Sequence, residues 1–413
     1  MSVPKIHPKN IEIHEFQYEL PEDKIAKFPI EQRDQSKLLV YENTEIIEDV
    51  YRNITRHIDE KTLILFNEAK VIHARLYFRK ETGGRLEIFC LEPDSRYADI
   101  STAMKQEGEV YWKCLVKGIQ RWKDDSPLLL DVEDPNFNAK AYKIKPEGNS
   151  LIIRFTWKKN VSFSEFLEEM GKIPIPPYLK RESDKSDDIR YQTIFAKNEG
   201  SVAAPTASLH FTESILEGFR KKNIDMEHLT LHVGAGTFMP VKSEKMEGHE
   251  MHSEWIEIPL DLLKRVKKQI ERKEKTIAIG TTSTRTIESV YWIGVQILRG
   301  EWNEEKEQGI AVEQWYPYEK EDEFSSLESV NALINYLDEK KVTKLITRTQ
   351  LIIAPGYDFK MIDGIITNFH QPSSTLLLII SALVGENWKT IYRYALDNNF
   401  RFLSYGDGSL LWK

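Results

Sequence analysis

The sequence predicts an α/β main domain with a mixed sheet, interrupted by an all-β insertion. With 413 residues the chain exceeds the usual size of one domain, so two domains, or one domain with a large insertion, are expected. From about Ile72 to Trp157, short strand-like segments follow one another without a helix, which is typical of a small barrel or sandwich. After Phe163, strand-like and helix-like segments alternate, which favours a parallel or mixed sheet flanked by helices. We therefore assign residues 1–71 and 158–413 to the α/β domain and residues 72–157 to the insertion.

The first part of the main domain contains two strand signals. A short helix led by acidic residues is expected after Pro21, and a polar loop then leads into a strand over residues 38–41. The apolar run of residues 62–66 predicts a buried strand that enters a polar turn at Asn67 and Glu68.

The insertion begins with a hairpin. Two alternating runs, "RLYFRK" and "RLEIFCLEP", are joined by Thr82, Gly83 and Gly84, which suit a tight turn. Further short strand-like runs follow, separated by turn residues: "EVYWKCLVKGI", "SPLLLDVED", "NAKAYKIKP" and "SLIIRFTW". Their succession is the reason for expecting a barrel or sandwich here.

Helices and strands alternate in the second part of the main domain. Helices are predicted over residues 164–172, 212–222 and 261–273, and strands over residues 227–233, 276–280 and 351–356. Between about Glu288 and Arg348 lies a charged segment that also contains tryptophan and tyrosine. We interpret this segment as a peripheral helical insertion.

Composition limits the classes of protein to which the chain can belong. Hydrophobic residues make up 41% and charged residues 30%, as in an ordinary soluble globular protein. The longest apolar run, residues 375–385, is too short to span a bilayer, and the first ten residues contain no apolar signal-peptide segment. The two cysteines, Cys90 and Cys114, exclude a disulfide framework and a zinc module built on cysteines. A cytoplasmic protein without a membrane partner is therefore expected.

The formal net charge of −8 argues mildly against a nucleic-acid partner, because backbone phosphates favour lysine and arginine. A local basic face would be sufficient to bind a nucleic acid. Candidate segments for such a face are "FRKETGGR", "KGIQRWKDD", "FTWKKN" and "IPPYLKR". Runs of this kind more often form a solvated surface than a phosphate-binding groove.

The segment "SVAAPTASLHFTES", residues 201–214, joins small residues to a helix start that carries His210. Thr212 is in position to act as the N-cap of this helix. Small residues let a backbone approach a ligand closely, and a helix N-terminus suits an anion or a polar substrate. The alternative is a tight connection whose small residues merely fit beneath a neighbouring sheet.

Four loops share this design, in which an apolar strand ends and small or hydroxylated residues follow. They are "PTASLHFTE", "LHVGAGTF", "AIGTTSTRT" and "TNFHQPSSTL". Because ligands of open α/β sheets bind beyond the carboxyl ends of the strands, we expect these loops to form one site. The candidate substrate-binding residues are Thr206, Thr212, Gly234, Gly236, Thr237, Thr281, Thr282, Ser283, Arg285 and Asn368. Arg285 suits a carboxylate or a phosphate, while a hydroxyl-rich N-cap explains "TTST" equally well.

Two other kinds of chemistry have weaker support in the sequence. His232, His249 and His252 form a metal site only if the fold gathers them, because "HEMH" lacks the histidine spacing of a zinc protease. Uncharged polar contacts in the substrate loops, with no metal, are the favoured interpretation. Ser208 and Ser283 lack the context of a nucleophile elbow, which argues against covalent serine catalysis.

Segments along nearly the whole chain resemble those of a known family. They include "LPEDKIAKFPIEQRDQSKLLV", "FNEAKVIHARL", "RKETGGRLEIF", "IPIPPYLKR", "RYQTIFA", "VAAPTASLHFT", "LHVGAGTF", "MHSEW", "GTTSTRTIES", "APGYDFKMIDGIITNFHQPSSTLL" and "FRFLSYGD". In this order they resemble the S-adenosylmethionine:tRNA ribosyltransferase-isomerase family of queuosine biosynthesis, with only residues 288–348, approximately, outside the likeness. The resemblance implies an α/β main domain with a mixed sheet, interrupted by an inserted six-stranded β-barrel.

The resemblance also implies a reaction. The ribosyl part of S-adenosylmethionine is transferred to the aminomethyl group of a 7-deazaguanine in tRNA and isomerised, which gives epoxyqueuosine and releases adenine and methionine. S-adenosylmethionine is then a consumed substrate, no cofactor is needed, and tRNA is the partner. His210 is the first candidate for acid–base catalysis, followed by His232, His370 and Asp407, the last in a glycine turn. Arg285 and the helix start after "TTST" would hold the methionine carboxylate.

The chain departs from the family pattern at several positions. Residues that differ from the usual ones are Glu68, Ala69, His73, Ser208, Gly408 and Ser409. Met239 and Ser373 stand where cations are expected, and their loss weakens the expected contact with tRNA. Two alternatives therefore stay open: a divergent member that uses another acceptor, and a catalytically silent RNA-binding protein or metal-dependent hydrolase on the same scaffold. We expect the chain to act as a monomer.

Overall fold

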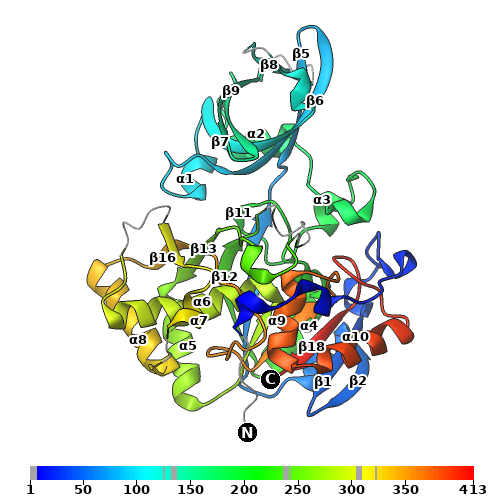
Figure 1. Cartoon of the computed structure of the whole chain (residues 1–413), viewed down its shortest axis with the longest axis vertical. Coiled ribbons are helices and arrows are strands. Elements are labelled where there is room, and N and C mark those ends of the chain that lie inside the picture. Colours follow the sequence, from blue (N-terminus) through cyan, green and yellow to red (C-terminus); the bar gives the residue numbers. More distant parts are fainter. Residues whose placement is uncertain are drawn as a thin grey trace.

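A barrel and a larger α/β domain make up the computed structural model of the chain (Figure 1). The structure describes residues 7–123, 126–131, 137–234, 236, 241, 243–303, 309–320 and 323–413. Within these residues ten strands form one mixed sheet, and six strands close into a barrel. The predicted fold class, an α/β domain interrupted by a six-stranded barrel, is therefore confirmed.

The main sheet is parallel in its middle and mixed toward both sides. Its strands are, in spatial order, β15 (Ile310–Val312), β16 (Lys344–Thr349), β13 (Glu254–Pro259), β12 (Asp225–His232), β3 (Leu63–Asn67), β14 (Thr276–Ile279), β17 (Gly364–Asn368), β18 (Gly408–Trp412), β1 (Lys37–Glu42) and β2 (Glu45–Val50). The neighbouring strands β12, β3, β14 and β17 run parallel to one another. On one side of this group β13 runs antiparallel to β12, and on the other side β18 runs antiparallel to β17. The carboxyl ends of the four parallel strands consequently lie at one edge.

Both faces of the sheet are covered, so its strands are apolar on both sides. In β3, Leu63 and Leu65 belong to one core while Ile64 and Phe66 belong to the core on the opposite face. The first core includes side chains of α5 (Leu260–Arg272), α6 (Gly280–Arg299), α8 (Ser326–Lys340), α9 (Thr375–Val384) and α10 (Asn387–Asp397). The second includes side chains of α4 (Glu213–Lys221) and the 3₁₀ helix η5 (Tyr51–His57).

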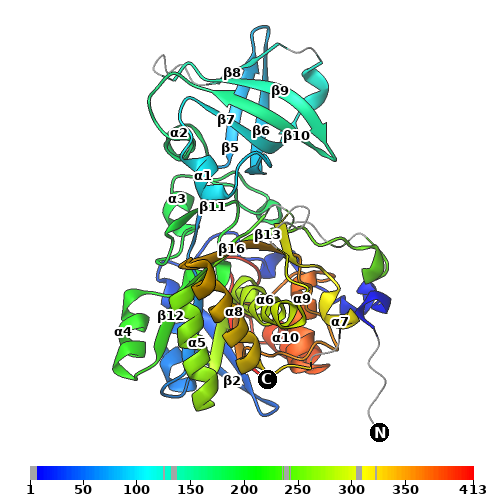
Figure 2. The same ribbon diagram turned by 90° about the vertical axis from the view of Figure 1, so that its left-hand side faces the viewer.

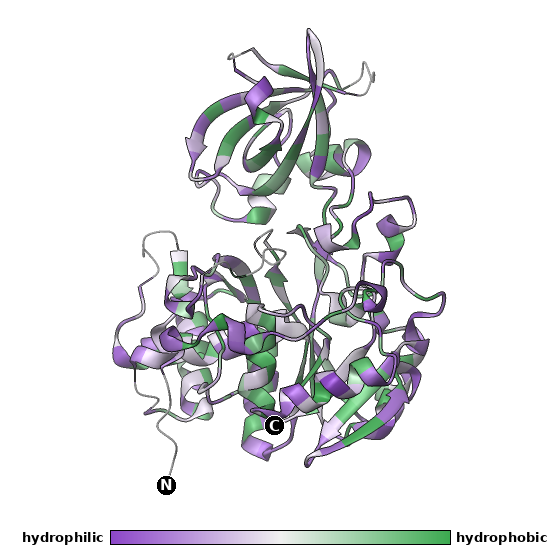
Figure 3. Ribbon diagram, turned by 45° about the vertical axis from the view of Figure 1, so that its right-hand side comes forward, coloured by the Kyte–Doolittle hydropathy of each residue, from purple (hydrophilic) through white to green (hydrophobic). Residues whose placement is uncertain are grey.

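The barrel is built from neighbouring antiparallel strands. Its closed order is β10 (Ser150–Thr156), β7 (Glu109–Lys117), β6 (Gly83–Pro93), β5 (Arg75–Lys80), β8 (Leu128–Leu130) and β9 (Lys140–Glu147). β5 and β6 form the hairpin that the sequence predicts. Alternate side chains such as Phe78, Trp112 and Phe155 fill the interior, together with the unbridged Cys90 and Cys114. In Figure 3 hydrophobic residues follow these strands, as they do the central strands and helices of the main domain.

A short two-stranded sheet connects the two bodies. β4 (Ala69–Val71), which leads into the barrel, pairs in parallel with β11 (Asn198–Ser201), which follows the return from it. The helices α1 (Ile100–Met104), α2 (Phe163–Met170) and α3 (Asp187–Arg190) lie at this junction or between it and the barrel (Figure 2). Barrel and main domain also touch through an ion pair of Glu92 with Arg348, whose nitrogen and oxygen lie 3.4 Å apart.

The remaining short helices are α7 (Tyr316–Glu319) and the 3₁₀ turns η1 (Pro8–Asn10), η2 (Ile13–Phe16), η3 (Glu22–Lys24), η4 (Arg33–Gln35), η6 (Ile119–Arg121), η7 (Pro177–Leu179), η8 (Thr206–His210) and η10 (Met246–Gly248). Among the described residues, we find no helix with the length and apolar character needed to cross a bilayer.

Residues 288–348 do not form a peripheral insertion, contrary to our interpretation of the sequence. α6 runs on from Gly280 to Arg299 and is buried as far as Gln296, while β15 and β16 complete one side of the main sheet. The charges that suggested an insertion lie on exposed positions such as Asp338 and Glu339 at the end of α8.

Two local predictions are also corrected. The expected strand at residues 351–356 is an irregular segment that is buried as far as Ala354. Leu351 donates its N–H to the Thr349 hydroxyl, which interrupts the strand pairing that β16 makes. α4 begins after Thr212 as predicted, but the Thr212 hydroxyl bonds the Asp34 carboxylate at 3.3 Å and does not cap the helix.

Candidate active site

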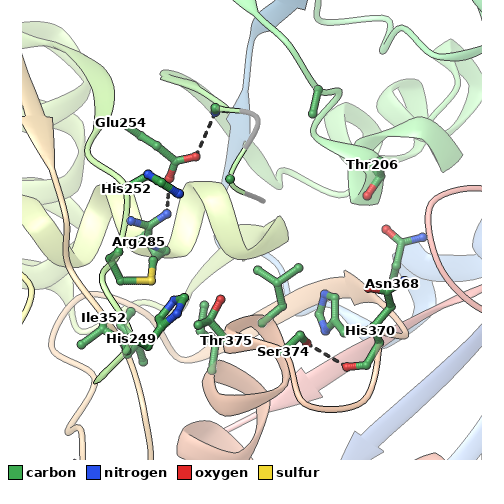
Figure 4. A pocket seen from close by; sticks show the side chains of 18 of the residues that line it. Thr206, His249, His252, Glu254, Arg285, Ile352, Asn368, His370, Ser374 and Thr375 are labelled. Carbon is green, nitrogen blue, oxygen red and sulfur yellow. Dashed lines mark hydrogen bonds and ion pairs between the residues drawn. The ribbon is translucent and has the colours of Figure 1, made fainter. Parts of the chain in front are cut away.

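A cavity of about 380 Å³ lies beyond the carboxyl ends of β12 and β17 (Figure 4). Its walls include the loops after these two strands, Arg285 in the second turn of α6, the first turns of α9 and the segment that precedes β13. Cavities of this size hold ligands of the size of a nucleoside. The position agrees with the rule that ligands of α/β sheets bind at the carboxyl edge.

A buried ion pair forms one end of the cavity. Arg285, on α6, pairs through Nη1 with Glu254 at the start of β13, and its Nε donates to the Leu351 carbonyl at 2.9 Å. Glu254 also accepts the N–H of Gly234 at 3.1 Å. The Nη2 nitrogen of Arg285 is buried and has no hydrogen-bond partner among the described residues. This nitrogen is therefore available for an anionic group of a ligand.

Two histidines lie beside the ion pair (Figure 4). The His252 ring packs against Gly236, where a Cβ atom would approach the ring carbon Cδ2 to 2.0 Å. Burial and the neighbouring His252 lower the pKa of His249, so its imidazole is neutral near pH 7. Gln314 holds the loop by donating to the His249 carbonyl at 2.7 Å and accepting the Met251 N–H at 2.9 Å.

Neutral polar groups form the other end of the cavity. Asn368, at the end of β17, and Thr206, at the start of η8, face each other across it (Figure 4). His370 lines the same end; its Nε2 lies 3.1 Å from the Thr367 hydroxyl and its Nδ1 lies 3.4 Å from the Tyr392 hydroxyl. Burial lowers the pKa of His370 to about 3, so this ring is neutral.

Of the four predicted catalytic residues, His370 lines the cavity and the other three do not. His232 is buried beneath the wall, with its Nε2 3.5 Å from Glu257. Asp407 accepts the backbone N–H groups of Lys37 and Arg401 at 3.0 and 2.8 Å, and these bonds fix its glycine turn outside the cavity wall.

His210 also lies behind the wall. Its ring stacks on Tyr51 with centroids 4.1 Å apart, and its Nε2 is 3.2 Å from the Asn368 amide nitrogen. Burial, with a smaller contribution from the positive charge of Arg401, lowers the pKa of His210 to about 3. His210 ends the 3₁₀ turn η8, which precedes the predicted helix start at Thr212 and buries this histidine.

The predicted substrate-binding residues divide in the same way. Those that line the cavity are Thr206, Gly234, Gly236, Arg285 and Asn368. Thr281, Thr282 and Ser283 do not line it, because β14 passes directly into α6 at Gly280, whose φ of +79° makes the turn. The expected polar loop does not exist, and the three side chains lie within the first turn of the helix. Thr212 lies outside the wall, and Thr237 falls outside the described residues, as does Met239.

The family model described as "Queuosine biosynthesis protein" matches residues 13–411, nearly the whole chain. The chain belongs to this family. It is 35% identical to the S-adenosylmethionine:tRNA ribosyltransferase-isomerase of Halothermothrix orenii, with 97% of this chain and 100% of the relative covered. It is 34% identical to the protein of the same name from Thermotoga maritima, over 97% and 100% of the two chains. A crystal structure of the S-adenosylmethionine tRNA ribosyltransferase of Thermotoga maritima aligns with a TM-score of 0.46 and 24% identity, covering 96% of this chain and 99% of that one.

Several cavity residues of this family member were not predicted from the sequence. They are Tyr178, Met251, Glu254, Gln371, Ser374 and Thr375. A signal for Glu254 was present in "MHSEW", since residues two apart in an extended chain face the same side. His252 and Glu254 have this spacing, and both face the cavity. Among the described residues, no group of three or more His, Cys, Asp or Glu side chains is arranged to hold a metal ion.

Proposed function

We propose that this member of the queuosine biosynthesis protein family transfers and isomerises the ribosyl part of S-adenosylmethionine onto the 7-aminomethyl-7-deazaguanine base of tRNA. The products are epoxyqueuosine in tRNA, adenine and methionine. The observation that carries the proposal is the cavity itself, which combines a buried guanidinium with an unpaired nitrogen and a neutral end lined by amide and hydroxyl groups. The names of the relatives over full length support the same activity.

The charged end suits the amino-acid part of S-adenosylmethionine. Arg285 Nη2 would bond the methionine carboxylate, since charge-assisted hydrogen bonds to guanidinium are among the strongest in proteins. A sulfonium acidifies the neighbouring C5′–H, so a modest base is enough to remove this proton. His249, whose lowered pKa keeps it unprotonated near pH 7, is the base we propose.

The acceptor is proposed to enter from the side of the barrel. Asn149, in the turn between β9 and β10, lines the cavity and so links the barrel to its mouth. Arg181, one of the basic groups in the four candidate segments, donates two hydrogen bonds of 2.7 and 2.8 Å to the Asp187 carboxylate and is therefore less suited to contact a phosphate. Lys180 is exposed and pairs with the exposed Glu22, a weak surface pair, so it remains suited to a phosphate.

We further propose that S-adenosylmethionine is consumed as a substrate and that no metal or cofactor takes part. A cytoplasmic location, where tRNA is found, and a monomeric state stay predictions. Size-exclusion chromatography with light scattering checks the monomeric state.

The test is turnover of S-adenosylmethionine by chelator-treated protein, with and without tRNA that carries the aminomethyl-deazaguanine precursor. We expect adenine and methionine to appear only with this tRNA, and the mass of the modified base to rise accordingly. Adenine release that ignores tRNA would indicate another acceptor. Activity lost with the chelator and restored by zinc would indicate a metal enzyme, and no adenine release under any condition would refute the proposal.

A further inference from the structure

The side-chain oxygen of Asn368 is a buried acceptor without a partner. Asn368 is 4% exposed and lines the cavity, and its Oδ1 has no hydrogen-bond partner among the described residues. In Figure 4 this oxygen points into the cavity while the amide nitrogen points away from it. Buried polar atoms are almost always hydrogen bonded, so an orphan that faces a cavity indicates a ligand atom.

The orientation of the Asn368 amide is determined by its neighbours. The Nδ2 nitrogen lies 3.3 Å from the Leu403 carbonyl and 3.2 Å from His210 Nε2. A backbone carbonyl can only accept, so it must face the NH₂ group. Turning the amide over would place its oxygen against the carbonyl oxygen of Leu403 and would leave the NH₂ group in the cavity.

His210 can support this orientation only as a neutral ring with an unprotonated Nε2. Burial holds its pKa near 3, and the hydrogen bond with the Arg33 backbone opposes this lowering, as expected if a carbonyl accepts from the ring. Since Nε2 is engaged by Asn368, the ring proton belongs on Nδ1. The stacked ring of Tyr51, inclined by 16°, fixes the plane of the imidazole.

We infer that Asn368 Oδ1 accepts a hydrogen bond from the nucleoside part of the ligand and that His210 is the positioning residue that presents this oxygen. The identity of the ligand rests on the proposed function. Charge favours one direction of binding: the carboxylate lies at Arg285, and the uncharged nucleoside lies at the end formed by Asn368 and Thr206. The donors available there are the ribose hydroxyls and the exocyclic amine of adenine.

The first experiment measures binding of S-adenosylhomocysteine by calorimetry, with the full chain and without tRNA. Three further probes are its 2′-deoxy analogue, its 3′-deoxy analogue and its inosyl analogue, which lacks the exocyclic amine. Wild type should bind one analogue about 10- to 100-fold more weakly than S-adenosylhomocysteine, as expected when a buried acceptor loses its donor. Asn368→Ala should bind that analogue and S-adenosylhomocysteine with nearly equal affinity. The analogue that is affected identifies the donor.

Equal discrimination by wild type and Asn368→Ala would overturn the inference and leave the proposed function standing. No binding of any adenosyl probe by folded wild type would overturn both.

The second experiment separates positioning from acid–base catalysis at His210. His210→Gln keeps an acceptor near the position of Nε2, whereas His210→Phe keeps the aromatic stack and removes the acceptor. We expect His210→Gln to discriminate between the probes as wild type does and to turn over within about 5-fold of the wild-type rate. In His210→Phe, the ratio of the affinities for the probes should fall at least 10-fold. A His210→Gln variant that binds normally but turns over 100-fold more slowly would show a general acid or base and overturn the assignment. Thermal unfolding of both variants confirms that they are folded.

Discussion

The two ends of the cavity hold their ligand-facing atoms by different means. At one end Arg285 and Glu254 are both charged and buried, and the guanidinium is fixed by an opposite charge and by a carbonyl. At the other end Asn368 and His210 are neutral, and the amide is fixed by a carbonyl and a ring nitrogen. At each end these anchors fix the side chain, and one polar atom is left without a partner among the described residues: Arg285 Nη2 at the charged end and Asn368 Oδ1 at the neutral end. With the proposed function, charge would set the direction in which the substrate binds, and neutral hydrogen bonds would discriminate between nucleosides.

The largest effect is expected at the charged end. Arg285→Leu leaves the Glu254 carboxylate buried without its cation, which should lower the free energy of unfolding by about 3–5 kcal/mol. Turnover should fall at least 100-fold, because the carboxylate anchor of the substrate is lost. Urea denaturation measures the first quantity and adenine release measures the second.

The double variant Arg285→Leu with Glu254→Leu is the matched control. Removing both charges should recover most of the stability, since the stranded carboxylate is gone, but none of the turnover. A double variant that regains turnover would show that the pair is structural, and the comparison of the two ends would then fail.

An effect of intermediate size is expected from pH at the neutral end. The pKa values of His210 and His370 are about 3 in the folded chain, against an ordinary value of 6.5. Between these values the unfolded chain binds more protons, so stability is fully present above pH 6.5 and is lost as pH falls toward 3. Each histidine should contribute a loss of about 1.4 kcal/mol per pH unit within this window.

Unfolding in urea at pH 6.5 and pH 5 checks this expectation. His370→Phe should lose about 2 kcal/mol less than wild type between the two values. His14→Phe, which alters an exposed ring with 70% of its side chain accessible, should behave as wild type. If His370→Phe shows the same loss as wild type, the ring is not held neutral and the contrast between the ends must be abandoned.

The smallest effect is expected at the two cavity glycines after β12. A methyl group at Gly236 would meet the His252 ring at 2.0 Å and must displace it, whereas at Gly234 no described heavy atom lies within 4 Å. Gly236→Ala should therefore raise the KM for S-adenosylmethionine about 10-fold, equivalent to about 1.4 kcal/mol, and Gly234→Ala should leave it within about 2-fold. Steady-state adenine release compares them, and equal KM values for the two variants would show that His252 does not shape the charged end.

The fold could be predicted where periodicity and connection lengths are decisive. Short strands without helices indicated the barrel, and alternating strands and helices indicated the sheet. The segment from residue 288 to 348 misled us because tryptophan and tyrosine side chains such as Tyr291 and Trp292 face the core, while many of its charges, such as Asp338 and Glu339, are exposed. Sequence order does not distinguish such a segment from an insertion.

The site was predicted in part, because the carboxyl edge of a parallel sheet is a general property of the fold. Which side chains face the cavity depends on backbone details that no local pattern contains. At Gly280 a single positive φ converts an expected loop into the first turn of α6, which removes Thr281–Ser283 from the wall. At His210 a 3₁₀ turn places the ring behind Asn368, so the side chain of Asn368 separates the first catalytic candidate from the cavity.

The position of β18 has a consequence for the order in which the protein assembles during synthesis. This strand lies inside the sheet between β17 and β1, where Leu38 pairs with Gly408, although it is the last strand to leave the ribosome. The barrel, whose strands lie between Arg75 and Thr156, can close as soon as its own segment emerges. β1 can pair with β2 at once, but more than three hundred further residues must be made before its other neighbour, β18, exists. The neutral end of the cavity, which needs Leu403, is completed equally late. A nascent chain therefore carries a finished barrel long before it carries a binding site.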